Sequence, residues 1–295
     1  MGIIPYDLLF TVSKYPQAEM KIDAESFFAS GGGPVPNVMV GMARMGFTSA
    51  LIAPVGNDPF GRIMLEELRT DKVNTDYMII KKDPTALATG WIEKGSGRRT
   101  MVLSRKIEVK PVDLKLDRLP MAKFIHLDGR DMPGTMKLAR WAKKNRIMVS
   151  FDIGSVRNDV SPVFPYVDHL VVADQYAFNF TKTKDVKKAI ARLKKICPGC
   201  VVITEGIKGS TGQDKDSSDF VYQKAFQVKN IDTTGAGDCY HTGYLFGWLN
   251  GADLAERMKF GAGAAALKCT QPGARKGIPN KRQLFTFLKS SPKTY

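Results

Sequence analysis

The sequence predicts an α/β fold, in which helices cover both faces of a mainly parallel sheet. Two observations predict it. Short apolar runs typical of buried strands recur along the chain, and segments with the 3.6-residue period of helices separate them, which is the order that a parallel sheet requires. The 295 residues, 43% of them hydrophobic, can fill a large core, and neither a repeat nor a long linker divides them. We therefore expect one domain over residues 1–295.

The elements alternate in a regular order along most of the chain. The strand candidates lie at Ala50–Val55, Phe124–Leu127, Ile147–Phe151, His169–Val172 and Val201–Thr204. The helix candidates lie at Phe60–Arg69, Pro133–Asn145 and Asp185–Cys197. Each of these helices has one apolar face, which we expect to pack on the sheet.

One region departs from this alternation. Ala86–Glu93 and Arg99–Ser104 are strand-like, and the glycine-containing segment Lys94–Arg98 between them predicts a hairpin. With an early strand near Leu8–Val12 they predict a small antiparallel sheet that projects from the main layer. Such a sheet beside a pocket acts as a lid, so residues 8–21 and 86–104 are the predicted lid segments. Its exposed edges are surfaces that a second subunit can cover, which predicts a homodimer through the lid.

The net charge of +15 favours anionic ligands such as nucleotides and sugar phosphates. Much of the charge is spread out. The basic segment Thr181–Ile196 has apolar residues at helical spacing, so we interpret it as the solvated face of an amphipathic helix rather than a nucleic-acid surface. A basic nucleic-acid-binding protein remains a rival reading that no motif supports.

Several classes of protein are disfavoured by what the sequence lacks. No run of about 18 apolar residues predicts a membrane span, and no secretory signal is visible, so we expect a cytoplasmic protein. Cys197 and Cys200 form a lone CxxC without the second pair or histidines that zinc requires, which favours reduced structural thiols.

The most informative segment is Asp232–Asp238, with the sequence DTTGAGD. It follows the strand-like Phe226–Val228 and opens directly into a helical pattern that ends at Asn250-Gly251. Gly235, Ala236 and Gly237 have no bulky side chain, so an anion can approach the backbone N–H groups at the helix start. A carboxylate at Asp238 is unsuited to anion binding alone, but it suits a general base that takes a proton from a nucleophile aimed at a phosphate. A plain helix cap is the structural alternative.

Asp232–Asp238 resembles the C-terminal signature of ribokinase-like (PfkB-type) carbohydrate kinases, and three more segments resemble the family in order and spacing. They are the glycine-rich Gly31–Asn37 with the helix after it, Gly56–Gly61 and Thr204–Gly209. The resemblance covers essentially the whole chain. It implies a three-layer α/β/α sandwich and an ATP-dependent phosphotransferase that uses Mg²⁺ and phosphorylates a sugar hydroxyl. The methionines of the helix after Gly33 are interpreted as core residues.

The resemblance also implies roles for individual residues. It assigns catalysis to Asp238 with Gly235, Ala236 and Gly237. Sugar binding is assigned to Asp7, Gly32, Gly33 and Asn37, and nucleotide binding to Thr204, Gly206, Lys208, Gly209 and Ala262. The small residues Gly261–Ala266 fit either an adenine ring against the helix or close helix packing, which the sequence leaves open. A monovalent-cation site for K⁺, formed in some relatives largely by backbone carbonyls, aligns with Asp232, Thr234, Lys268, Gln271, Gly273 and Gly277.

The chain departs from the family at two places. The stretch Ala173–Tyr176 lacks the Asn-x-x-Glu motif that organises magnesium and phosphates in many relatives. Two interpretations stay open: Asp174 substitutes for the motif, or ATP and water mainly hold the magnesium. Ribokinase usually has a lysine where this chain has Pro34, which disfavours ribose.

The substrate prediction comes from the end of the strand at Phe124–Leu127. Asp128 there can accept hydrogen bonds from sugar hydroxyls, and Arg130, with Arg99 of the lid, can bind an anionic substituent. This segment and Ala264–Pro279 resemble ketohexokinases and bacterial sulfofructose kinases, so a ketohexose or an anionic ketohexose derivative is the predicted acceptor. A nucleoside kinase on the same fold and an inactive sugar- or nucleotide-binding sensor are the alternatives. The sequence leaves open which sugar, which hydroxyl, the oligomeric state and the cation dependence.

Overall fold

The computed structural model describes residues 1–95, 98–154, 159–290 and 293–295. Its main layer is a six-stranded sheet with the strand order β14-β13-β12-β11-β10-β9. Four of these strands run parallel, β9 (Phe124–Leu127), β10 (Met148–Ile153), β11 (His169–Ala173) and β12 (Cys200–Thr204). The antiparallel β13 (Ser210–Gln213) and β14 (Phe220–Gln223) extend it at one edge. Four of the five predicted strands therefore form the predicted parallel sheet.

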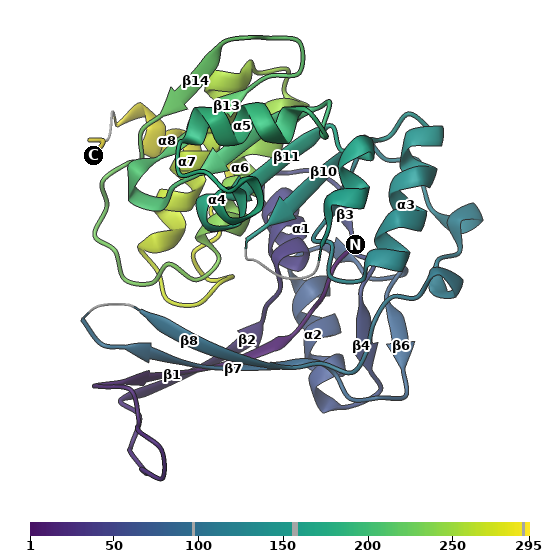
Figure 1. Cartoon of the computed structure of the whole chain (residues 1–295). Helices are drawn as coiled ribbons and strands as arrows, with labels where there is room; N and C mark the ends of the chain where they lie inside the picture. Colours follow the sequence, from purple (N-terminus) through teal and green to yellow (C-terminus); the bar gives the residue numbers. More distant parts are fainter. Residues whose placement is uncertain (96–97, 155–158, 291–292) are drawn as a thin grey trace.

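Helices cover both faces of this sheet (Figure 1). One layer contains α3 (Met132–Lys144), α4 (Asp174–Thr181) and α5 (Val186–Lys194), and the other contains α1 (Pro34–Arg44), α6 (Ala236–Leu249), α7 (Leu254–Cys269) and α8 (Lys281–Lys289). Successive residues of β11 serve the two cores in turn, because Val171 packs with α1 and α6 while Leu170 and Val172 pack with α3–α5. Strands buried on both faces explain why their sequences are continuous apolar runs.

A second sheet projects from this body, with the order β2-β1-β7-β8 (Figure 1). It contains β1 (Tyr6–Val12), β2 (Ser26–Gly31), β7 (Leu87–Glu93) and β8 (Arg99–Ser104). The predicted hairpin forms between β7 and β8, although residues 96–97 lie outside the described part of the chain. The prediction of a wholly antiparallel sheet was wrong, because β1 pairs with β7 in parallel.

The rest of the first hundred residues joins the sheet to the body. Here lie α2 (Pro59–Thr70) and four short strands, β3 (Ser49–Ala50), β4 (Pro54–Gly56), β5 (Val73–Asn74) and β6 (Ile79–Lys81). The single strand predicted over Ala50–Val55 is instead β3 and β4, which pair separately with β5 and β6. The prediction of a strand at Phe226–Val228 was also wrong. Of these three residues, Phe226 alone takes part in β-pairing, as an isolated bridge to Thr294.

The other interpretations of apolar and sulfur-containing residues are consistent with the structure. Met39, Met42 and Met45 of the α1 region are buried in the core. Cys197 and Cys200 are buried free thiols, and Cys200 Sγ accepts a hydrogen bond from the Tyr244 hydroxyl at 3.2 Å. Within the described ranges, every helix is too short or too polar to cross a lipid bilayer.

Candidate active site

The glycine turn before α6 is held in place by Asp232. One carboxylate oxygen of Asp232 accepts hydrogen bonds from the backbone N and the hydroxyl of Thr234, at 2.8 and 2.7 Å, and the other accepts one from Gly273 N at 2.8 Å. Burial opposes ionisation of Asp232, but these hydrogen bonds and the nearby Lys268 charge hold its pKa below the ordinary value. Gly235 then takes the left-handed conformation, with φ of 78°, and α6 begins at the next residue. The first N–H groups of α6 thus have no carbonyl partner within the helix.

A pocket of about 380 Å³ lies on one side of this turn. It brings together predicted residues that are far apart in the sequence. Its lining includes Asp7, Gly33, Asn37, Arg99, Arg130, Thr234, Gly235 and Asp238. The walls come from β1, the start of α1, β8 of the projecting sheet and the start of α6. We call this space the acceptor pocket.

Asp238 lies at the base of the acceptor pocket, in the first turn of α6. The Asn37 side-chain amide donates a hydrogen bond to Asp238 Oδ2 at 2.6 Å. Burial, and then the charge of Asp152, raise the pKa of Asp238 to about 7, while Asn37, His241 and Arg99 act in the opposite direction. A carboxylate with this pKa can hold or release a proton near neutral pH.

Asp7 is the second titratable group of the acceptor pocket. Burial raises its pKa to about 7, although the charges of Arg275 and Arg99 favour ionisation. Gly32 is not part of the pocket lining, but a Cβ on Gly32 would lie 2.2 Å from Asp7 Oδ2, so only glycine lets this carboxylate approach the backbone. The structure therefore gives Gly32 a supporting place beneath Asp7.

Sequence reasoning missed a buried arginine behind the pocket. Arg275, which is 5% exposed, donates hydrogen bonds to Asn37 Oδ1 at 3.3 Å and to Glu67 Oε2 at 2.8 Å. A Cβ on Gly31 would lie 2.3 Å from the Arg275 guanidinium, so the first glycine of the glycine-rich segment makes room for this side chain. Arg275 thereby fixes the amide of Asn37 so that its NH₂ group points at Asp238.

Sequence reasoning also missed Asp152 and His241. Asp152 is the next-to-last residue of β10, and its Oδ1 lies 3.1 Å from Nε2 of His241. His241 lies about one helical turn beyond Asp238 in α6. The charge of Asp152 is one cause of the raised pKa of Asp238. These residues carried no signal in the sequence, because isolated Asp and His residues near strand or helix ends are common.

A second cavity of about 380 Å³ shares Pro34 and Arg130 with the acceptor pocket. Asp128 lies here rather than beside Asp238, and its carboxylate accepts hydrogen bonds from the backbone N atoms of Ile3 and Arg130. The same cavity is lined by Arg105 and by Tyr176, whose hydroxyl is buried without a hydrogen-bond partner among the described residues. We call this space the side cavity.

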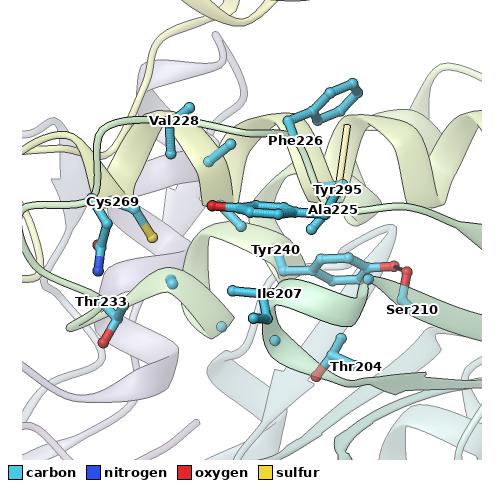
Figure 2. Close-up of a pocket in the computed structure, with 18 residues that line it drawn as sticks. Thr204, Ile207, Ser210, Ala225, Phe226, Val228, Thr233, Tyr240, Cys269 and Tyr295 are labelled. Carbon is cyan, nitrogen blue, oxygen red and sulfur yellow. Dashed lines mark hydrogen bonds between the residues drawn. The ribbon is translucent and has the colours of Figure 1, made fainter. Parts of the chain in front are cut away.

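A mostly apolar cavity of about 330 Å³ lies on the other side of the turn (Figure 2). Of the predicted nucleotide-binding residues, Thr204, Gly206, Gly209 and Ala262 line it. Lys208 does not, and its carbonyl accepts a hydrogen bond from the Tyr222 hydroxyl at 2.7 Å. Figure 2 shows the rings of Tyr240 and Tyr295 and the side chains of Phe226, Val228 and Ile207 around the cavity, none of which was predicted. We call this space the apolar cavity.

The small residues Gly261–Ala266 of α7 serve both a cavity wall and close helix packing. Ala262, Ala265 and Ala266 line the apolar cavity, whereas a Cβ on Gly261 would lie 3.0 Å from the Tyr240 carbonyl and one on Gly263 2.9 Å from Leu288. One side of the helix therefore forms cavity wall, and the other side allows close packing on α6 and α8.

The residues aligned with a monovalent-cation site do come together, but a side chain already binds their carbonyls. They belong to two segments. The turn before α6 contains Asp232 and Thr234, and the last turn of α7 with the loop after it contains Lys268, Gln271 and Gly273. Lys268 Nζ donates hydrogen bonds to the backbone oxygens of Asp232 at 2.7 Å and Gln271 at 3.0 Å. Gly277 packs against the Lys268 carbonyl, 2.7 Å from where its Cβ would be.

The described residues that line the apolar cavity include no acidic side chain. Among the described residues, no three His, Cys, Asp or Glu side chains gather closely enough to hold a metal ion. Asp174, at the start of α4, and Glu205, after β12, are near each other, since burial and then the charge of Asp174 raise the pKa of Glu205.

Comparison with known proteins covers nearly the whole chain. The family described as pfkB family carbohydrate kinase matches residues 1–281. An uncharacterized sugar kinase of Archaeoglobus fulgidus is 27% identical over 260 residues, covering 81% of this chain and 98% of the relative. A 5-dehydro-2-deoxygluconokinase of Bacillus subtilis is 21% identical over 282 residues, covering 88% and 86%.

A similar result comes from solved structures. The structure of a putative ribokinase from Agrobacterium tumefaciens has a TM-score of 0.86 at 24% identity, and the match covers 98% of this chain and 95% of that one. This likeness confirms the fold class that the sequence predicts.

Proposed function

The chain belongs to the PfkB family of carbohydrate kinases and is an ATP-dependent sugar kinase; from that premise, we propose that it phosphorylates a ketohexose or an anionic ketohexose derivative, with Asp238 as the general base. A single observation carries the proposal. The turn at the start of α6 separates two pockets, with Thr234, Gly235 and Asp238 facing the acceptor pocket, and with Thr233, Ala236 and Gly237 facing the apolar cavity. A phosphoryl group that passes between the pockets must pass the backbone of this turn, where the N–H groups of Thr234 and Ala236 already donate to Asp232 and Thr233 and the N–H groups of Gly237 and Asp238 begin α6.

The acceptor pocket supports the binding of a sugar. Asn37 offers an amide that both donates and accepts, and Asp7 offers a buried carboxylate. Sugar hydroxyls require such a mixture of donors and acceptors. We assign Asp7, Gly33, Asn37, Arg99 and Arg130 to acceptor binding, with Gly32 and Asp128 supporting Asp7 and Arg130.

The proposed reaction is an in-line transfer. Asp238 takes the proton of the sugar hydroxyl as the hydroxyl oxygen forms a bond to the γ-phosphorus of ATP. The bond between that phosphorus and the bridging oxygen breaks, and ADP leaves with the bonding electrons. The N–H groups of Gly237 and its neighbours, with the positive end of the α6 dipole, stabilise the negative charge on the transferred group.

We place the adenine and ribose of ATP in the apolar cavity, against Ala262, Ala265 and Ala266 of α7. Thr204, Gly206 and Gly209 form the opposite wall. Mg²⁺ is part of the proposal as an ion that neutralises charge on the ATP phosphates, and Asp174 and Glu205 are the acidic residues that would face it. Because they are two rather than three, we expect phosphates and water to supply the other ligands.

An anionic group on the sugar is favoured by the charges around the acceptor pocket. Arg99 and Arg130 both line it, and burial lowers the pKa of Arg130, as expected for a guanidinium held away from water. The side cavity adds Arg105, which also pairs with Asp131, and the Tyr176 hydroxyl, which has no hydrogen-bond partner among the described residues. A phosphate or sulfonate on the sugar can therefore extend past Pro34 toward Arg130.

ATP turnover against a panel of acceptors tests this proposal. Ketohexoses, their phosphates, sulfofructose, ribose and nucleosides are each added with Mg-ATP, and ADP is measured. Strong turnover with a ketohexose or its anionic derivative is the expected result. A preference for nucleosides would instead establish the nucleoside kinase, and ATP binding without turnover on any acceptor would favour the inactive sensor.

The pH dependence follows from the two raised pKa values. Asp238 and Asp7 are both protonated below about 7 because burial disfavours their charged forms. We expect kcat/KM for the sugar to rise with pH through about 7 and then to level off. The rise in the pH profile should be steeper than the ionisation of a single group produces, because two carboxylates lose their protons in this range. The Asp7→Asn variant should show the shallower limb of a single ionisation. A profile that is flat across neutral pH would remove both carboxylates from these roles.

Gly237 allows a test of the phosphate-binding turn that leaves the fold intact. A Cβ built at Gly237 meets no atom within 4 Å, and alanine is favoured over glycine in a helix by up to about 1 kcal/mol. We expect Gly237→Ala to have an unchanged or higher Tm, but a higher KM for ATP and lower kcat, because the methyl group occupies the approach of the phosphates. Unchanged kinetics would place the phosphates elsewhere.

We also propose that the projecting sheet is a lid and a dimer interface. Arg99, Met101 and Leu103 of β8 line the acceptor pocket, so the sheet covers the acceptor. Its outer strands expose apolar side chains, with Phe27 57% and Val102 58% exposed. A second copy of the sheet is the proposed cover, and the mass of the protein in solution decides between monomer and dimer.

A further inference from the structure

The buried ammonium group of Lys268 connects the turn before α6, which contains Asp232, with the turn after α7, which contains Gln271. Lys268, in the last turn of α7, is 0% exposed. Its Nζ donates to the carbonyl oxygens of Asp232, at 2.7 Å, and Gln271, at 3.0 Å. The Asp232 carboxylate in turn binds Thr234 and Gly273, so the ammonium, the carboxylate and both turns form one connected network.

A charge buried this deeply needs specific compensation. Burial lowers the pKa of Lys268, and the charge of Asp232 opposes that effect. Carbonyl oxygens satisfy two of the three ammonium hydrogens. An ammonium ion and K⁺ carry the same charge, have nearly the same size and are both bound by carbonyl oxygens. Lys268 therefore provides at this point what a bound monovalent cation provides.

We propose that Lys268 is a built-in monovalent cation, which organises the Asp232–Asp238 turn in place of a diffusible ion, so that the kinase needs no K⁺. This corrects the prediction of a K⁺ site, since the carbonyls of Asp232 and Gln271 already accept hydrogen bonds from Lys268. Lys268 lines neither the acceptor pocket nor the apolar cavity and acts through the turn, which makes it a positioning residue. It holds the backbone whose N–H groups face both pockets.

The first test compares salts on the wild-type protein. Thermal unfolding and turnover are measured in KCl, NaCl and choline chloride at one ionic strength. The expected result is the same Tm and the same turnover in all three. A Tm or kcat that rises specifically with K⁺ would overturn the proposal.

The second test removes the ammonium. In choline chloride, Lys268→Ala should have a lower Tm and about 100-fold lower kcat, because a small misplacement of a reacting group has costs of this size. KCl or NH₄Cl should raise both quantities, since either cation can enter the space left by the side chain. Lys268→Met removes the charge but keeps most of the volume, so salts should not rescue it.

Lys259→Ala is the matched control, because Lys259 is an exposed lysine of the same helix. It should leave Tm, kcat and the response to salts unchanged. If Lys268→Ala is impaired and no cation restores its Tm, Lys268 is a structural tie alone and the proposal is wrong. If Lys268→Ala is unimpaired, the proposal is wrong as well. The Tm series needs no activity, so it decides the role of Lys268 even if every tested sugar fails as an acceptor.

Discussion

Replacing Asp238 by asparagine is expected to lower kcat by about 10³-fold, because general-base catalysis contributes about 10²–10⁴-fold and an amide cannot take the hydroxyl proton. The amide has nearly the same shape and can still accept the Asn37 hydrogen bond at its oxygen. The apolar cavity and the N–H groups of the turn stay in place. We therefore expect Kd for ATP to remain unchanged, which calorimetric titration of the variant can check.

The same substitution should stabilise the fold at alkaline pH. A folded-state pKa of about 7, against an ordinary value of 3.8, corresponds to up to about 4 kcal/mol of unfavourable ionisation. A group with a raised pKa adds stability below its unfolded value, and that stability is lost as the pH rises through the folded value. Asp238→Asn avoids the loss, so its Tm should exceed the wild-type Tm above pH 7 and approach it in acid. Near-normal turnover, or a lower Tm at alkaline pH, would contradict the role of Asp238.

The second large effect is expected at Arg275. Arg275→Met leaves the Asn37 oxygen without the Arg275 donor and removes the cation beside Glu67, whose Oε2 keeps only the hydrogen bond from Gly31 N, and breaking a buried pair costs about 3–5 kcal/mol. We expect the free energy of unfolding to fall by about 3 kcal/mol. This is the lower end of that range, because the Glu67 side chain is 31% exposed. The freed Asn37 amide can then turn away from Asp238, so KM for the sugar should rise while KM for ATP does not.

A double-mutant cycle separates these contributions. Glu67→Gln removes the opposite charge with little change in shape, and the coupling with Arg275→Met gives the share of the loss that belongs to the ion pair. Denaturant unfolding supplies the free energies. An Arg275→Met protein with unchanged stability and unchanged sugar KM would show that the network does not position Asn37.

The fold was predictable because its signals are local. The parallel strands are apolar on both faces. The N-cap residues of α2, α5 and α7 are Asp58, Asp185 and Asp253, and each of their side chains accepts a capping hydrogen bond. Strand β2 was missed, because an edge strand with half-exposed residues has no continuous apolar run. The turn at Gly235 was found because three small residues before a helix are unusual.

Each site residue that sequence reasoning missed takes its place through contacts with residues that are far away in the sequence. Arg275 follows a glycine turn and looks like a surface arginine in the sequence. Only the fold brings it to Glu67, Asn37 and the backbone of Gly31–Gly32, some 200 positions away along the chain. Tyr240 likewise follows the Asp232–Asp238 turn without a local signal, and its position beside Ser210 depends on how α6 packs on the sheet.

Arg99 and Asp7 both stand on the projecting sheet, on β8 and β1, whereas Asp238 belongs to α6 of the body, and the charge of Arg99 lowers the pKa of both carboxylates. If the sheet swings away, Asp7 keeps this cation but Asp238 loses it, so the pKa of Asp238 rises further. A smaller fraction of Asp238 is then ionised and able to activate water against ATP. If the sheet is the proposed lid, its opening thus limits the hydrolysis of ATP in the absence of sugar, and the ratio of sugar-free ATP hydrolysis to sugar phosphorylation measures this effect.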